Sequence, residues 1–512
     1  MTCLLACLGV FTTTQAQSGS YTDWYKEYND SVQGIRLNEA IQYLNLKKIA
    51  PKKRVIVGII DSGIDTTLVD IKAALWTNPK EKPDGKDNDK NGYVDDIHGW
   101  NFLGTADGSF NMTSAGTQDF REFKRLYPKY KEVKEVSEVE DPAEYAYYEE
   151  MKRKAGITNY IKFAHYMGSK NEAYHYMDKV LSQQPDLNKD TLSLKGLMHL
   201  SLATEEWNNA CQLIFTDLYK ADKKMLWADF LEQHKNAFHL VNSRISGIEH
   251  EPDKRLLMGD NLTDPKDRFY GNPILQVEGC EHGTAVAGLI AAQGITHPEH
   301  MGVYPDAQLM IIRAVPDGDE YDKDIASAIR YAVDNGAKVI NLSLGKYNSP
   351  HSTMVNEAIA YAAKKDVLLI QAAGNDGKNI DEVNYFPSAL NTKGERLNNY
   401  LRVGSTNLKG ERSKFSNYGT TQVDVFAPGE QLVCHSLGDK LMISQGTSLS
   451  APIVSGLAAL LRAHFPKLKA HQIKDILVRS VRPKTIEQLS QSGSGVVDAL
   501  QAVQLAKTYK KR

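Results

Sequence analysis

Short runs of apolar, often β-branched residues recur along this chain, separated by amphipathic stretches. One run, residues 55–60, ends at Asp61, and similar runs cover residues 307–312, 338–343, 367–370 and 401–403. Unbroken apolar runs of this length are typical of strands buried on both faces, as in parallel sheets. Helical periodicity appears between them, at residues 324–333 and 354–363. The pattern therefore predicts an α/β fold in which helices flank a parallel β-sheet.

Residues 104–270 have a different character. Lys-, Glu- and Tyr-rich helical segments dominate there, and the β-branched runs disappear. This region is too long and too amphipathic for a plain loop. We expect an α-helical subdomain inserted into the α/β domain, which itself comprises residues 54–103 and 271–505. A basic tail follows at residues 506–512.

The first residues have the features of an export signal. An apolar run of about ten residues leads to Thr14-Gln15-Ala16, a small-x-small cleavage pattern, so residues 1–16 are predicted to be a signal peptide. Residues 17–53 then form an N-terminal extension that contains one helix. Export to the periplasm, the cell envelope or the medium is expected. Two alternatives stay open: a lipid anchor on Cys7, and a buried N-terminal strand or helix.

Composition narrows the functional classes. The chain has 512 residues, is 42% hydrophobic and carries a formal net charge of −2, which gives no support for binding nucleic acid or an anionic membrane surface. No later stretch reaches the roughly 18 apolar residues that a transmembrane segment needs. After signal removal three scattered cysteines remain, Cys211, Cys280 and Cys434, which are not a disulfide framework. Free thiols are expected, and one bridge is the alternative.

Three short blocks carry the groups of a serine nucleophile with its base and orienting acid. They are Asp61-Ser62-Gly63, His282-Gly283-Thr284 and Gly446-Thr447-Ser448. Asp61 follows a predicted strand, while His282 and Ser448 each open a helical stretch rich in small residues. A helix N-terminus favours the negative charge that develops when a serine attacks a carbonyl. The long interval between Asp61 and His282 is explained by the predicted insertion.

Two further blocks follow predicted strands. Asn375 lies on the glycine-rich loop 371–377, where its amide and the Ser448 backbone N–H could bind an oxyanion. Residues 341–345 (NLSLG) end another strand and could pair with an extended peptide. In a parallel sheet, functional residues are expected at the carboxyl ends of strands, where Asp61, Ser343 and Asn375 all lie.

Together these five blocks resemble the subtilisin-like serine proteases, or subtilases. The order Asp, His, Ser is the subtilisin order. The resemblance covers residues 54–103 and 271–505, and it implies a subtilisin-like fold and no cofactor for catalysis. It also implies a role for each matching residue: Ser448 as nucleophile, His282 as general base and acid, Asp61 as orienter, Asn375 as oxyanion donor, and Ser343, Leu344, Gly345, Ala373 and Gly374 as substrate-binding residues.

The chain departs from the family pattern at several points. Ala285 and Leu449-Ser450 replace residues common in the histidine and serine blocks, and both changes leave the chemistry intact. The extension at residues 17–53 is shorter than the folding propeptide of many relatives, so the usual autocatalytic maturation is not expected.

We expect an exported serine endopeptidase that hydrolyses protein or peptide substrates. A processing protease or exopeptidase restricted by the insertion is one alternative, and a catalytically silent peptide-binding scaffold is another. The intact set of Asp61, His282, Asn375 and Ser448 argues against the silent scaffold.

Residues 87–96 (DNDKNGYVDD) have the spacing of the first half of an EF-hand loop. Oxygen ligands stand at positions 1, 3 and 5, and glycine at position 6 permits the sharp turn. At position 12, where an EF-hand has a glutamate, this chain has His98. A structural Ca²⁺ is predicted, and a solvated acidic turn is the alternative. The candidate ligands are Asp87, Asp89, Asn91, Tyr93, Asp95 and Asp96.

Overall fold

The fold comes from a computed structural model that describes residues 23–200, 202, 204–250, 253–482 and 495–509. The predicted signal peptide and the end of the predicted tail lie outside these residues. The chain divides into two compact units, an α/β unit of residues 1–118 and 254–512 and a helical unit of residues 119–253. The predicted insertion, residues 104–270, is longer than the helical unit, since residues 104–118 and 254–270 belong to the α/β unit.

The described part of the α/β unit contains a nine-stranded sheet in the order β12-β13-β9-β8-β7-β6-β1-β4-β2. β12 runs antiparallel to β13, and the other pairings are parallel. The predicted parallel α/β sheet is therefore confirmed. The strands are β1 (Ile56–Asp61), β2 (Gly99–Asn101), β4 (Gln308–Arg313), β6 (Val339–Leu342), β7 (Leu368–Ala372), β8 (Tyr400–Thr406), β9 (Val425–Pro428), β12 (Val481–Arg482) and β13 (Val496–Val497).

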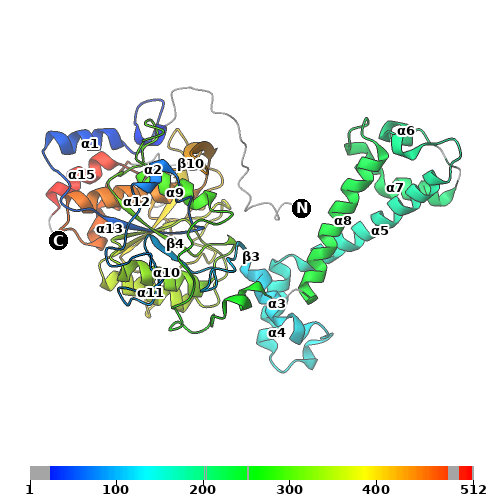
Figure 1. The fold of residues 1–512 in the computed structure, drawn as a ribbon, viewed down its shortest axis with the longest axis horizontal. Coiled ribbons are helices and arrows are strands. Elements are labelled where there is room, and N and C mark those ends of the chain that lie inside the picture. The colour runs from blue at the N-terminus through cyan, green and yellow to red at the C-terminus, as the bar shows by residue number, and fades with distance from the viewer. Residues whose placement is uncertain (1–22, 201, 203, 251–252, 483–494, 510–512) are drawn as a thin grey trace. The chain divides into compact units, whose positions relative to one another are not determined.

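Helices cover both faces of this sheet (Figure 1). Along β1, Val57 and Ile59 belong to one hydrophobic core and Ile60 to another, because successive side chains of a strand point to opposite faces. The first core includes α9 (Glu281–Ala291), α12 (Thr447–His464) and α13 (Ala470–Arg479), and the second includes α10 (Asp322–Asp334) and α11 (Ser352–Lys364). Strand β1 is thus apolar at successive positions because both of its faces are buried.

Smaller elements complete the α/β unit. The strands β10 and β11 form an antiparallel pair, and β3 pairs in parallel with β5. These elements are η1 (Trp24–Lys26), α1 (Leu37–Leu46), α2 (Val69–Lys72), β3 (Ser114–Gly116), η4 (Lys254–Met258), β5 (Asp317–Gly318), β10 (Leu432–Ser436), β11 (Lys440–Ser444) and α15 (Ala499–Thr508).

The helical unit has its own hydrophobic cores. Helix α5 packs against both α7 and α8, around buried Tyr174, Trp207 and Trp227. Phe123 and Tyr148, which stack at 5.5 Å between ring centroids, belong to a second cluster. The elements are α3 (Gln118–Tyr130), η2 (Val136–Glu138), α4 (Pro142–Lys154), α5 (Ile157–Ser182), η3 (Lys189–Thr191), α6 (Leu194–Met198), α7 (Glu205–Lys220) and α8 (Trp227–His250). No helix in the described ranges combines the length and apolarity that crossing a membrane requires.

The described part of the N-terminal extension is built into the α/β core. Trp24 and Tyr25 are 3% and 2% exposed and belong to the same cluster as α12. Helix α1 packs against α15, and the backbone N–H of Ala499 donates to the carbonyl of Ile35 at 2.7 Å. Arg36 pairs with the buried carboxylate of Asp498 at 3.2 Å. The first and last described segments of the chain are thus joined.

Tyr25→Ala should lower the free energy of unfolding by about 3–5 kcal/mol, because it removes a buried aromatic ring and leaves a cavity. The same change removes the hydrogen bond from the Tyr25 hydroxyl to the Met301 carbonyl, 3.1 Å. Urea denaturation would measure the effect. Ile41→Ala, at a position of α1 that is 40% exposed, is the control and should change stability by about 0.5 kcal/mol or less. Equal effects in both variants would contradict the structural role of this segment.

Candidate active site

Asp61 is the last residue of β1 and is 2% exposed. Its Oδ1 accepts a hydrogen bond from the backbone N–H of Ser62 at 2.8 Å, while Oδ2 is buried and has no hydrogen-bond partner among the described residues. The chain turns immediately afterwards at Gly63, whose φ is +92°. A Cβ at Gly63 would lie 2.3 Å from the carbonyl oxygen of Leu275, so only glycine fits this turn. The turn leaves Asp61 at the carboxyl edge of the sheet.

His282 lies in the first turn of α9 and contacts Asp61 directly. Its Nδ1 is 2.7 Å from Asp61 Oδ1, so the Nδ1–H donates to the carboxylate and Nε2 is left as the basic nitrogen. The close approach depends on Gly283, because a Cβ there would lie 2.0 Å from the carbonyl oxygen of Gly63. The Gly283 backbone N–H also donates to Ser62 Oγ at 3.3 Å. The glycines of both blocks let the helix start and the strand end meet.

The Asp61 carboxylate controls the protonation of His282. Desolvation within the site lowers the pKa of His282, but the charge of Asp61 and its hydrogen bond raise it, and the net pKa lies above the ordinary 6.5. The imidazole side chain remains 41% exposed. It is therefore oriented, polarised and still accessible to a reactant.

Ser448 is the second residue of α12, directly after Thr447, and its backbone N–H is one of those that the start of a helix leaves without an intrahelical partner. Asn375 lies beside it. The Asn375 Oδ1 accepts from the Thr447 backbone N–H and from Thr447 Oγ1, both at 2.9 Å. These two donors fix the amide orientation, which leaves Nδ2 as a donor without a partner among the described residues. A Cβ at Gly446 would lie 2.9 Å from Ser448 Oγ and 3.4 Å from Asn375 Nδ2. Both atoms therefore border the same small space.

Strand β6 connects these two halves of the site. Its Leu342 pairs with Ile60, the neighbour of Asp61, and with Gln371 of β7 on the other side. The next residue, Ser343, donates from Oγ to the Ser448 carbonyl at 2.7 Å. The four predicted catalytic residues thus converge at one edge of the sheet. No hydrogen bond between Ser448 Oγ and His282 is recorded in the described structure, and such catalytic hydrogen bonds often tighten only when substrate binds.

Ser343 has a contact that the sequence did not indicate. Its Oγ also accepts from Asn341 Nδ2 at 2.9 Å, and Asn341 Oδ1 accepts from Ser455 Oγ at 2.9 Å. This buried chain of hydrogen bonds fastens α12 to β6. No local sequence pattern could have predicted these hydrogen bonds, because they join β6 to residues of α12 more than 100 positions away.

The other predicted substrate-binding residues lie on the same two segments. Leu344 and Ala373 are 6% and 0% exposed, so their side chains are part of the cores. Gly345 and Gly374 instead approach one aromatic ring, that of Tyr385. A substrate role for these four residues would therefore depend mainly on their backbones. It remains a prediction.

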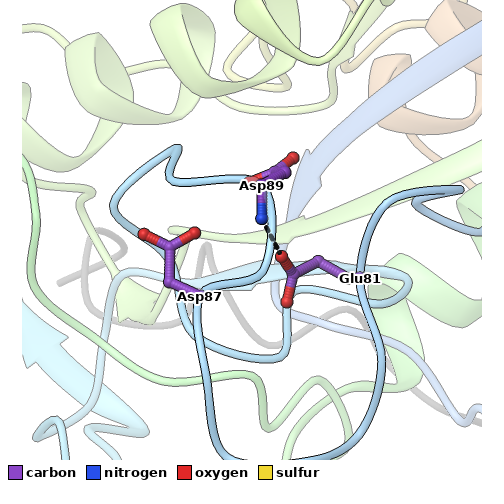
Figure 2. A group of neighbouring side chains, drawn as sticks. All are labelled: Glu81, Asp87 and Asp89. Atoms are coloured by element: carbon purple, nitrogen blue, oxygen red, sulfur yellow. Dashed lines mark hydrogen bonds between the residues drawn. The ribbon is translucent and has the colours of Figure 1, made fainter.

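The acidic loop brings two of the predicted metal ligands together with a third residue (Figure 2). Oxygens of Asp87, Asp89 and Glu81 all lie within 4.8 Å of one another. Asp87 accepts from the backbone N–H groups of Asn91 and Gly92, which closes the loop. Sequence analysis missed Glu81, because it precedes the motif. The one hint in the sequence was His98 at position 12 of the loop, where an EF-hand has a glutamate ligand.

The remaining predicted ligands have other partners. Asp95 accepts from the backbone N–H groups of Asp84 and Gly85 and closes the preceding turn. Asp96 is fully buried and accepts from the Tyr331 hydroxyl at 2.7 Å and from Asn91 Nδ2 at 3.0 Å; burial raises its pKa to about 6. The Tyr93 hydroxyl donates to the carbonyl of Arg268. Asp95 and Asp96 thus lie outside the acidic group.

Among the described residues, the three cysteines are free thiols. Cys280 lies just before His282 but is 2% exposed, and burial raises its pKa. A buried thiol with a raised pKa is a poor nucleophile. The described environment of Cys280 thus gives it no part in the site.

The chain also matches a known protein family. The sequence model of the subtilase family matches residues 182–500, more than half of the chain. The matched range includes His282, Asn375 and Ser448, whereas Asp61 lies before it.

Individual relatives match about half of the chain. A thermophilic serine proteinase from Bacillus sp. (strain AK1) is 35% identical over 227 residues, which are 44% of this chain and 52% of that protein. Subtilisin BL from Lederbergia lenta is 32% identical over 255 residues, 50% of this chain and 86% of that protein. The cell wall-associated protease of Bacillus subtilis is 34% identical, with 46% of this chain and 25% of that protein covered. The match thus spans only part of several relatives.

Among solved structures, a protease from Pseudoalteromonas arctica is 31% identical and has a TM-score of 0.38, with 44% of this chain and 70% of that chain covered. The family match over residues 182–500 extends from within the helical unit to the start of α15. This family match and the 32% identity to subtilisin BL, of which 86% is covered, show that the chain belongs to the subtilase family of serine proteases.

Proposed function

We propose that the chain is a serine endopeptidase in which Asp61, His282 and Ser448 act as a catalytic triad. The observation that carries the proposal is the 2.7 Å hydrogen bond between His282 Nδ1 and Asp61 Oδ1. It lies at the sheet edge where Asn375 borders the same space as Ser448 Oγ. A scaffold that only bound peptides would have no need of this bond or of an oriented amide.

The first half of the reaction forms an acyl-enzyme. Ser448 Oγ attacks the substrate carbonyl carbon while His282 Nε2 takes the hydroxyl proton. The C–N bond of the tetrahedral intermediate then breaks, and His282 returns the proton to the leaving amine. Asp61 stays ionised throughout and stabilises the imidazolium.

The second half repeats these steps with water. His282 takes a proton from water as the water oxygen attacks the acyl carbon. The C–O bond to Ser448 breaks, Ser448 regains its proton and a carboxylic acid leaves. In both halves the oxyanion would be held by Asn375 Nδ2 and by the Ser448 backbone N–H. In subtilisin, loss of the corresponding asparagine donor lowers kcat by about 10²–10³.

We also infer that the acidic loop binds a structural Ca²⁺. Three carboxylates within 4.8 Å of one another repel unless a cation lies between them. Glu81 is 8% exposed, and its Oε2 is buried without a hydrogen-bond partner in the described structure. Such an oxygen is costly unless it has a ligand. Glu81 would supply the carboxylate that the loop lacks at position 12, and oxygen-only ligands suit Ca²⁺.

The apolar N-terminal run supports export, so the proposed substrates are proteins or peptides outside the cytoplasm. A narrower processing or exopeptidase role, gated by the helical unit, is the alternative within the same chemistry. Cleavage of an unbiased peptide library distinguishes these alternatives. Cuts at internal bonds of many peptides support a general endopeptidase, whereas cuts confined to termini or to one motif support the narrower role.

A fluorophosphonate probe should label the purified protein at Ser448, and Ser448→Ala should abolish labelling. For a peptide substrate, Ser448→Ala should lower kcat by about 10⁶-fold, the loss measured for the nucleophile in subtilisin. Ser31→Ala, at an exposed position, is the control and should react as the parent does. A folded, calcium-supplemented parent that takes no label would instead support the silent scaffold.

Asp61→Asn should lower kcat by about 10⁴-fold, as in other Ser–His–Asp triads. His282 must be neutral to act as a base, so kcat/KM rises as pH increases through its pKa. Because Asp61 raises that pKa, the acid limb of the parent should inflect above pH 6.5. In Asp61→Asn the inflection should move to lower pH. A pH–rate profile measures both, and an unmoved inflection would contradict the proposed Asp61–His282 coupling.

Ca²⁺ at 100 times its Kd should raise the free energy of unfolding by about 2.7 kcal/mol, because the ion binds only the folded loop. Calorimetric titration and thermal unfolding of the EDTA-treated full chain measure binding and stabilisation. Glu81→Gln keeps the size of the side chain but should weaken Ca²⁺ binding at least tenfold. Asp84→Asn, an acid of the same loop outside the group, is the charge-matched control. Equal affinities in parent and Glu81→Gln would exclude Glu81 as a ligand.

A further inference from the structure

Two glycines on the predicted substrate-binding segments face one aromatic side chain. A Cβ at Gly345 would lie 2.2 Å from the Tyr385 hydroxyl oxygen, and a Cβ at Gly374 would lie 2.8 Å from the same atom. The end of the Tyr385 ring therefore lies between the segment that ends at Gly345 and the loop that leads to Asn375. Only the missing side chains of these glycines leave room for it.

The backbone around Tyr385 is held in place. Phe386 and Lys346 exchange backbone hydrogen bonds of 2.9 and 3.3 Å, which attach this segment to the residue after Gly345. The buried Arg402 guanidinium donates to the Pro387 carbonyl at 2.7 Å and to the Tyr385 carbonyl at 3.4 Å.

The ring itself is also fixed. It packs edge-on against Tyr347, with centroids 5.3 Å apart, and the residue is 8% exposed. The hydroxyl has no recorded hydrogen bond within the part of the chain that the structure describes. Tyr385 thus presents a rigid, polar-tipped surface to the space between the two glycines.

The proposed function places a substrate side chain in that space. The scissile carbonyl must lie at Ser448 and Asn375, and the peptide on its acyl side would run along residues 343–345. The side chain of the residue that carries this carbonyl, P1, would then enter between residues 343–345 and 373–375. There it would meet the Tyr385 hydroxyl, which already lies against Gly345 and Gly374.

We propose that Tyr385 restricts P1 to small residues, namely glycine, alanine and serine. A larger side chain such as phenylalanine would have to displace a ring that Tyr347, Gly345 and Gly374 hold from three sides. A well-packed site resists added volume at a cost that grows with each extra group. A small side chain leaves the ring in place. This inference rests on the proposed peptidase function and names its substrate class.

The test uses two peptidyl phosphonate probes that differ only at P1, alanine against phenylalanine. The rate of Ser448 labelling by each probe is measured in the full-length protein. The parent should react with the alanine probe at least about tenfold faster, the scale on which a pocket discriminates small differences in side-chain size. In Tyr385→Gly the preference should reverse. Tyr385→Phe keeps the ring and should keep the preference for alanine.

The outcomes separate the inference from the proposed function. Equal labelling of the parent by both probes, or an unchanged ratio in Tyr385→Gly, would overturn the role of Tyr385 and leave the peptidase intact. If Tyr385→Gly does not fold, Tyr385→Leu provides the same comparison with a shorter side chain. No labelling of the folded parent by these probes or by a simple fluorophosphonate would overturn the peptidase and the P1 assignment together.

Discussion

The parallel hydrogen bonding of β1, β6 and β7 is the constraint on which the site depends. Because parallel strands end at the same edge, Asp61 and Ser343 emerge side by side, and Asn375 follows three residues after β7. Ser343 then fixes α12 through the Ser448 carbonyl. Reactive groups far apart in sequence thus depend on one register, and a slip of that register would separate them.

Backbone proximity is the second requirement, and glycine meets it. The carbonyl of Gly63 approaches Gly283 too closely for any side chain, which allows the Asp61–His282 hydrogen bond. Gly345 and Gly374 also lack a side chain where there is no room for one, because the Tyr385 ring occupies that space. Small residues in these blocks therefore serve two purposes. One pair brings reactive groups together, and the other admits an aromatic ring.

Much of this arrangement was predictable from the sequence, for a physical reason. Apolar runs fix β1, β6 and β7, and the residues that end them, such as Asp61, follow directly. Glu81, the Ser343 contact with Ser448 and the position of Tyr385 were not predictable, because each depends on tertiary contacts without a local pattern. Strands of two or three residues, such as β2, are too short to show periodicity. The limits of the helical unit depend on packing rather than on composition.

The burial of Trp24 and Tyr25 in the main core has a consequence for proteolytic processing of this chain. Loss of residues 24–46 would remove buried aromatic side chains and the helix that packs against α15, so it would destabilise the folded α/β unit. Excision of this segment is therefore not expected to be a maturation step. Residues 24–46 connect the first described elements to α15 near the other end of the chain. Proteolytic trimming that preserves the fold should therefore end on the N-terminal side of Trp24.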